Sequence, residues 1–182
     1  GIPEIRDEEG RGKRPVSNQK RGEPREFGRL LQDIVGVEAI INRVVVHETY
    51  ENQIKWFEET YKKYEIENMI IVGGESSKVK YLGPSVNEIL EEVSYKYNSV
   101  GRDIFCGGIA IPSRKRESKN LIKKSKHGAE FFTTQVLCDS ENIIKMIDKY
   151  QNRCNDLNTF PRRILLSFAP VSSIKNIEFL KW

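Results

Sequence analysis

Apolar residues along the chain follow two spacings. Short runs rich in β-branched and aromatic residues are typical of buried parallel strands, and they lie at residues 39–47, 68–72, 103–111, 129–135 and 163–169. Elsewhere apolar residues recur every three or four positions, which is the spacing of one helix face. These segments predict helices at residues 23–35, 51–64, 83–97, 115–126 and 140–153, with another beginning near residue 174.

Pro24 fits the first turn of the first helix and Gly36 its end, and its apolar face is formed by Phe27, Leu30, Leu31 and Ile34. Ser140 is the expected N-cap of the helix at 140–153, whose inward residues are Ile143, Ile144 and Ile147.

Strict alternation of strands and helices predicts an α/β fold with a parallel sheet. An open doubly wound sheet and a (β/α)8 TIM barrel both have this pattern. Ile2-Pro3-Glu4 is typical of the end of one more strand. We interpret residues 1–182 as a single partial TIM-barrel domain with about six of the eight strands, lacking the first and last. Residues 6–25, rich in charged residues, Gly and Pro, are expected to form a mobile loop over the rim; the alternative is a solvated loop.

Composition limits the classes of partner. The chain has 182 residues, of which 38% are hydrophobic and 31% charged, and its net charge is +4. This weak basic excess suits anionic small molecules and does not require nucleic acid. The three Cys residues lie far apart, without the spacing of a zinc site, and no run approaches the roughly 20 apolar residues of a membrane span. We therefore expect a cytoplasmic protein that binds neither nucleic acid nor membrane.

Polar residues follow the predicted strands. In βα-repeat folds the chemistry lies at the carboxyl ends of the strands, which share one rim. A Gln side chain both donates and accepts hydrogen bonds, carboxylates hold a ring N–H or act as acid or base, and His carries protons. The alternative for each residue is that it satisfies only local backbone groups. The candidates are Glu4, His47, Glu48, Gly73, Gly74, Glu75, Ser113, Thr134, Gln135 and Ser172.

One segment resembles a family signature. Gly128-Ala129-Glu130-Phe131-Phe132-Thr133-Thr134-Gln135-Val136-Leu137-Cys138-Asp139 is similar to the "GA-(two apolar)-TQ-(three residues)-D" strand of methylenetetrahydrofolate reductases. The other strands resemble that family in the same order, over roughly residues 39–176. The resemblance implies a TIM barrel in which this strand is the sixth.

The resemblance also implies a chemistry. These enzymes reduce 5,10-methylenetetrahydrofolate to 5-methyltetrahydrofolate with FAD and a nicotinamide donor, and the Gln at the position of Gln135 hydrogen-bonds the pterin. Glu75 stands where the family has an Asp near the flavin and pterin, so it is the catalytic candidate. We assign Glu4, Glu48, Gly74, Glu75, Thr134, Gln135 and Ser172 to the substrate, and His47, Gly73 and Ser113 to a cofactor.

The chain also departs from the family pattern. Gly73 replaces an Arg, and Ile111-Pro112-Ser113-Arg114-Lys115-Arg116 replaces a segment that contributes to the flavin site. The first hypothesis is therefore a protein that binds tetrahydrofolate or 5-methyltetrahydrofolate without flavin. An FAD-dependent reductase is the second, and a non-catalytic methyl-folate carrier that delivers methyl groups to a corrinoid or methyltransferase protein is the third. A methyltransferase or a redox protein is the expected protein partner. Arg114–Arg116 would meet a folate glutamate tail or another anion, or else form a solvated helix start.

Overall fold

A computed structural model describes residues 2–3, 22–74, 78–98, 104–136, 139–169 and 171–181. Five strands form one parallel sheet in the order β1-β2-β3-β4-β5, so neighbours in space are neighbours in sequence. The strands are β1 (Ile40–Val44), β2 (Asn68–Val72), β3 (Phe105–Ala110), β4 (Phe131–Val136) and β5 (Arg163–Ser167). The helices are α1 (Pro24–Val35), α2 (Tyr50–Tyr64), α3 (Val86–Asn98), α4 (Glu117–Lys126), α5 (Ser140–Asp156) and α6 (Ile174–Lys181).

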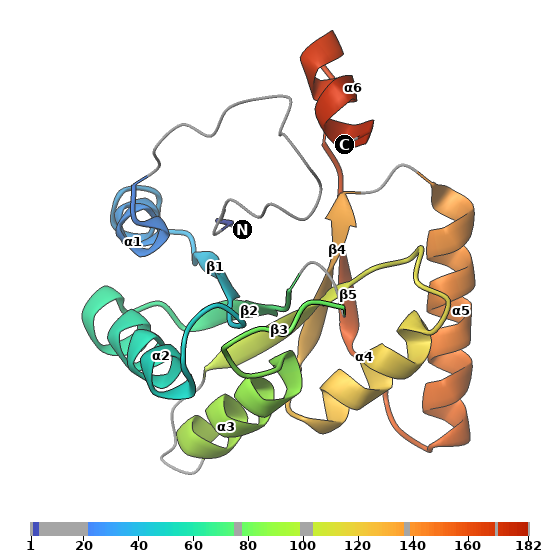
Figure 1. Cartoon of the computed structure of the whole chain (residues 1–182), viewed down its shortest axis with the longest axis horizontal. Helices are drawn as coiled ribbons and strands as arrows, with labels where there is room; N and C mark the ends of the chain where they lie inside the picture. Colours follow the sequence, from blue (N-terminus) through green and yellow to red (C-terminus); the bar gives the residue numbers. More distant parts are fainter. Residues whose placement is uncertain are drawn as a thin grey trace.

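This sequential parallel order is that of a (β/α)-barrel and not of a doubly wound sheet, in which the strand order reverses. Ile2 extends the order by one position, because it forms a parallel bridge with Ile41 at the outer edge of β1. Helices α2 to α5 follow one side of the sheet, and α6 stands apart beyond the carboxyl ends of the strands (Figure 1). The predicted fold, a TIM barrel represented in part, is confirmed.

The main core lies between the sheet and its helices. Phe57 of α2, Leu90 of α3, Leu121 of α4 and Phe132 of β4 have no exposed surface. Each such side chain contributes about 1.5–3 kcal/mol of burial free energy. Cys106 also lies in this core, where desolvation, with a contribution from Glu130, raises the pKa of its thiol to about 12. The core therefore holds the strands in place and keeps this thiol protonated.

Local sequence determines where the helices begin and end. Pro24 starts α1, and Gly36 ends it in the left-handed conformation at φ 69°, as predicted. For α5 we predicted Ser140 as the N-cap, and this is wrong. The carboxylate of Asp139 accepts the backbone N–H groups of Glu141 and Asn142 instead, because it reaches two free N–H groups of the first turn at once.

In α1 and α5, some apolar residues that the helical spacing places toward the core are exposed instead. In α5, Ile143 is buried as expected, but Ile144 is 58% exposed and Met146 takes the inner position. In α1, the buried residues are Arg25 and Gly28. A Cβ at Gly28 would lie 2.9 Å from the Ile41 Cδ1 methyl group and 3.0 Å from that of Ile66, so these side chains would have to shift to admit it. The close approach of the α1 backbone thus turns Phe27, Leu30 and Ile34 outward.

The remaining sequence predictions concern segments and partners. Residues 6–21 of the expected loop lie outside the described residues, and Pro24 and Arg25 already belong to α1. In the described part of the chain, no helix has the length and apolar character needed to span a bilayer. Within the same part, no cluster of three His, Cys, Asp or Glu side chains is placed to hold a metal ion.

Candidate functional site

The carboxyl ends of the strands form a rim that carries most of the predicted site residues. All neighbouring strands pair in parallel, so their carboxyl ends lie at one edge of the sheet. His47 follows β1, Gly73 and Gly74 follow β2, Ser113 follows β3, Thr134 and Gln135 end β4, and Ser172 follows β5. Glu4 and Glu75 lie outside the described residues, so their assignments stay predictions.

Tyr81 covers the ends of β1 and β2. Its ring meets His47 edge-on, with 5.5 Å between ring centroids. The same ring fills the space above Gly74, where a Cβ would lie 2.2 Å from a Tyr81 ring atom. Gly83 anchors the segment by donating its N–H to the Val46 carbonyl at 2.8 Å. A ligand that approached the Gly74 backbone would therefore have to displace Tyr81.

Glu48 is held by a buried polar network beneath the same strand end. Its carboxylate lies 2.9 Å from a guanidinium nitrogen of Arg43, whose side chain is 5% exposed. Arg43 Nε also donates to Gln53 Oε1 at 2.9 Å, and Gln53 Nε2 donates to the Val45 carbonyl. The guanidinium stacks on Trp56, 4.7 Å from the ring centre. This network holds the connection between β1 and α2 in place, and Glu48 contributes to it through its ion pair with Arg43.

A β-bulge shapes the end of β4. The β4–β5 register shifts between Thr133 and Val136. Thr134 is buried, and its Oγ1 accepts the Ser167 backbone N–H at 2.8 Å, while Thr133 Oγ1 lies 3.1 Å from Ser167 Oγ. The next residue along β4, Gln135, is exposed. Because bulges redirect side chains at barrel rims, Thr134 joins the two strands and Gln135 is left at the surface of the rim.

Ser113 and Ser172 lie in two different settings. Ser113 is exposed in the turn between β3 and α4. Ser172 and Ser173 both donate their hydroxyl groups to Asn176 Oδ1, at 3.0 and 2.8 Å, in the first turn of α6. Ser172 is thus part of a local helix-start motif, and its assignment to substrate rests on its place at the rim alone.

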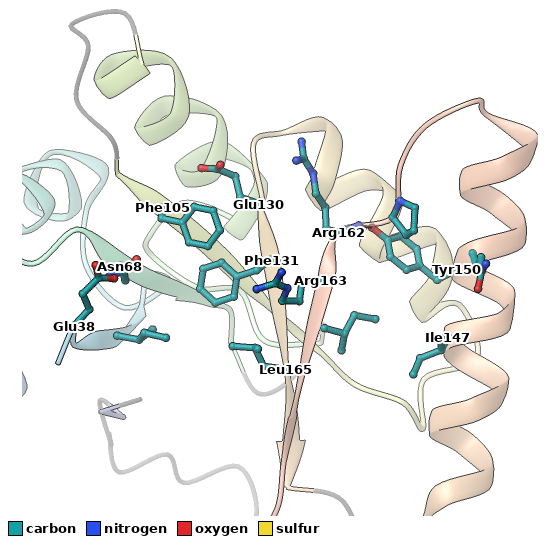
Figure 2. Close-up of a pocket in the computed structure, with 14 residues that line it drawn as sticks. Glu38, Asn68, Phe105, Glu130, Phe131, Ile147, Tyr150, Arg162, Arg163 and Leu165 are labelled. Carbon is teal, nitrogen blue, oxygen red and sulfur yellow. Dashed lines mark hydrogen bonds between the residues drawn. The ribbon is translucent and has the colours of Figure 1, made fainter.

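A large cavity lies at the opposite end of the sheet, and we call it the lower pocket. Its volume is about 910 Å³, and it is lined by residues at the amino ends of the strands and by part of α5. Phe105 and Phe131 stack there with centroids 4.9 Å apart, and Asn68 donates to Glu38 at 3.0 Å. Figure 2 shows Phe105, Phe131 and Arg163 turned toward the same space. In a closed barrel, inward positions of this kind form the packed interior.

Sequence reasoning missed two side chains of the rim. Tyr81 is a single aromatic residue in a loop rich in Lys and Gly, and no periodicity marks it. Glu117 is only 1% exposed and lies under the β3–α4 turn, where its carboxylate accepts a hydrogen bond from the Ile111 N–H at 3.1 Å. The signal for Glu117 was an acidic residue directly after three basic ones at a helix start.

The fold is that of a (β/α)-barrel protein, a class in which sites lie at the carboxyl ends of the strands. A profile of the methylenetetrahydrofolate reductase family matches residues 21–181, and the chain belongs to that family. Comparison with curated protein sequences gives no match.

Solved structures show the same fold. One is an uncharacterized protein from Clostridium thermocellum that binds two copies of 5-methyl-5,6,7,8-tetrahydrofolic acid; it is 20% identical, with a TM-score of 0.55 over 93% of this chain and 67% of that one. Another is 2,3-dimethylmalate lyase, a PEP mutase/isocitrate lyase superfamily member, 11% identical, with a TM-score of 0.55 over 86% and 62%. This chain thus spans about two thirds of the length of these structures.

Proposed function

We propose that this chain binds a reduced folate of the 5-methyltetrahydrofolate class at the carboxyl-end rim of its sheet. Membership of the methylenetetrahydrofolate reductase family supports this ligand class, and so does the ligand of the Clostridium thermocellum structure. The observation that carries the proposal is the exposed Gln135 at the β4 bulge. Its carboxamide presents a donor and an acceptor, which match the edge of a pterin ring.

Other rim residues have supporting roles in the proposal. Tyr81 and His47 form an aromatic wall beside the strand ends, and such a wall suits a flat heterocycle. Thr134 fixes the bulge that presents Gln135. Glu75, for which the sequence predicts a catalytic role, keeps that role as a proposal.

Calorimetric titration with 5-methyltetrahydrofolate tests the proposal. The chain offers a matched control, because Gln151 is exposed and lines the lower pocket. Losing a hydrogen bond to a desolvated ligand costs about 1–3 kcal/mol, so Gln135→Ala should weaken binding by about 5- to 150-fold. Gln151→Ala should bind like the unchanged chain. Equal affinity of the unchanged chain and Gln135→Ala would refute the role of Gln135. A loss confined to Gln151→Ala would place the ligand in the lower pocket.

The second candidate function is an FAD-dependent methylenetetrahydrofolate reductase, and family membership favours it. Two of the residues assigned to a cofactor are already in close contact with other side chains. His47 meets the Tyr81 ring edge-on, and a Val86 methyl group lies 3.1 Å from a Cβ built on Gly73, so a flavin at this place would require these side chains to move. Titration with FAD, followed by flavin absorbance and fluorescence, separates the two functions. Stoichiometric FAD binding would favour the reductase, and its absence at saturating FAD would favour the flavin-free folate protein.

The cellular setting belongs to the same proposal. A folate-binding protein of this family would act in one-carbon metabolism in the cytoplasm. A methyltransferase or a redox protein would then take up or supply the folate-bound group. Co-purification of a corrinoid or methyltransferase protein with the tagged chain, reduced by competing 5-methyltetrahydrofolate analogues, would support this setting.

A further inference from the structure

Helices α4 and α5 pack against each other on the helix side of the sheet (Figure 1), and an apolar groove lies along their junction. It consists of two adjoining hollows of about 460 and 200 Å³, and Ile122 of α4 and Leu157 at the end of α5 line both. The buried residues Tyr150 and Cys154 also line it. We call this surface the α4–α5 groove. The residues that line it are all described, and none of them belongs to the rim.

Phe160 is the most exposed large apolar residue at the α4–α5 groove. It is 96% exposed, and Leu157 is 46% exposed. An aromatic side chain buries about 150–250 Å² when it is covered, and a few such anchors carry most of the binding energy at protein interfaces. Phe160 therefore offers one large apolar anchor to a partner that also fills the groove.

The loop that carries Phe160 is held on both sides. Helix α5 is followed by Asn158 in the left-handed conformation at φ 51°. The N–H groups of Asn158 and Thr159 donate to carbonyl groups in the last turn of α5, at 3.0 and 2.9 Å, in the paired pattern of a Schellman motif. On the other side, the Arg162 N–H donates to the Tyr150 hydroxyl oxygen at 3.0 Å. Because this backbone is fixed before a partner arrives, binding through Phe160 costs less conformational entropy.

The border of the α4–α5 groove is mainly positive. Among the residues that line it, four are basic and one, Asp156, is acidic. The basic residues are Lys119, Lys126, Arg153 and Arg162. All of these except Arg153, which donates from Nε to Ser118 Oγ at 3.1 Å, are exposed. An apolar groove with a basic border complements a ligand that is apolar on one face and acidic on its flanks.

We propose that the α4–α5 groove is a docking site for an acidic amphipathic helix of a partner protein. Such a helix lays its apolar stripe into a groove of this kind, and Glu or Asp on its flanks would face the basic border. An extended segment would need a free sheet edge for its backbone hydrogen bonds, whereas the walls here are helices whose backbone groups bond within the helix. A proline-rich segment needs several exposed aromatic side chains, and among the residues that line this groove Phe160 alone is exposed and aromatic. The site lies outside the rim and does not depend on the folate function.

Peptide selection followed by fluorescence anisotropy tests the apolar part of the proposal. A display library of peptides of about 15 residues, the length at which helices become stable in water, is selected on the unchanged chain. The selected peptide is then titrated with Phe160→Ala and with Tyr95→Ala, its control, because Tyr95 is 76% exposed on α3. We expect Phe160→Ala to bind about tenfold more weakly or worse, and Tyr95→Ala to bind like the unchanged chain. A proline at the centre of the peptide should abolish binding, because it breaks a helix.

Charge reversal tests the basic border. Lys119→Glu/Lys126→Glu reverses two charges of the groove, and Lys55→Glu/Lys62→Glu reverses two exposed charges at the same spacing on α2. The groove variant should bind the selected peptide about tenfold more weakly at low salt, with a smaller loss at high salt, and the α2 variant should bind it normally.

Several results would overturn the proposal. They are selected peptides without an apolar stripe flanked by Glu or Asp, no selected peptide whose binding depends on Phe160, and equal losses in the groove and α2 variants. Self-association of the unchanged chain in analytical ultracentrifugation, lost in Phe160→Ala, would also overturn it, because the groove would then hold a second copy of this chain.

Discussion

At the scale of single residues, the site depends on how closely Tyr81 packs over the ends of β1 and β2. The ring touches His47 and fills the space that a Gly74 side chain would need. Gly83 has no room for a Cβ either, because the carbonyl oxygens of Glu48 and Val45 lie 2.2 and 2.5 Å from that position. Two glycines therefore let one aromatic side chain close this part of the rim, and the position of Tyr81 determines the space left for a ligand.

Replacing Gly74 with Ala should displace Tyr81 and cost about 1–3 kcal/mol of unfolding free energy, as overpacking does elsewhere. Urea unfolding measures this cost. The same substitution in a Tyr81→Ala background should be nearly neutral, since the conflict is with the ring. Gly22→Ala is the control, because no atom lies within 4 Å of its new Cβ. An equal cost of Gly74→Ala with and without Tyr81 would show that the ring is not what excludes the methyl group.

At the scale of elements, buried ion pairs link strand ends to the helices that follow. Glu117 and Lys124 lie about two turns apart on the same face of α4, and their charged groups are 3.7 Å apart. Lys124 also donates a hydrogen bond to the Ile109 carbonyl of β3. Burial lowers the pKa of Lys124, and the attraction of Glu117 opposes this shift only in part. Arg43 and Glu48 form the corresponding link after β1. Loss of Glu117 would leave Lys124 without its carboxylate at a largely buried position, and loss of Glu48 would do the same to the buried Arg43.

Glu117→Ala should therefore destabilise the chain by about 3–5 kcal/mol, the usual effect of breaking a buried pair. Chemical denaturation followed by circular dichroism provides the measurement. Glu141→Ala is the matched control, because Glu141 pairs with Lys145 at 3.0 Å on the exposed surface of α5, and such pairs contribute less than about 1 kcal/mol. Similar losses in both variants would contradict a structural role for the buried carboxylate.

The sequence predicts the secondary-structure elements of this chain better than the side-chain contacts at the rim. Among the described residues, periodicity located the strands and helices of the structure, and the parallel order of βα units brought the strand ends to one rim. It did not predict the Asp139 cap, since Asp and Ser both cap helices and only geometry selects one. Nor did it predict the outward stripe of α1, which follows from the contact of Gly28 with Ile41. The roles of Tyr81 and Arg43 depend on contacts between distant segments, which no local pattern encodes.

At the scale of the whole molecule, the described sheet is an arc with apolar surface near both of its ends. Phe27 and Ile34 of α1 are 53% and 73% exposed at one end, and Phe168 and Ile174 are 72% and 76% exposed at the other. In the described part of the chain, the outer edge of β5 has no strand partner. The proposed ligand site lies on the strand ends between these two edges.

Stability of the whole chain should fall in acid. Hydrogen bonds from Arg25 outweigh the effect of burial and lower the pKa of Glu23. A bond from Lys96 lowers that of Glu58, and the Ser85 N–H lowers that of Glu88. A carboxyl group with a lowered folded pKa stabilises the fold above its unfolded pKa, near 4.5, and loses this contribution as the pH falls through the folded value.

Urea unfolding at a series of pH values measures this dependence. The free energy of unfolding should decrease steadily as the pH falls below about 4.5. The triple variant Glu23→Gln/Glu58→Gln/Glu88→Gln should be less stable at pH 7 and show a shallower decrease in acid. The same slope in both proteins would mean that other groups control the acid response.

The central claim is that the rim, and not the lower pocket, binds a reduced folate. A crystal structure of the chain soaked or grown with 5-methyltetrahydrofolate tests this claim most directly. The account predicts a pterin ring hydrogen-bonded to Gln135 at the β4 bulge. A folate bound between Phe105, Phe131 and Arg163 with the rim empty, or no bound folate at saturating concentration, would contradict it.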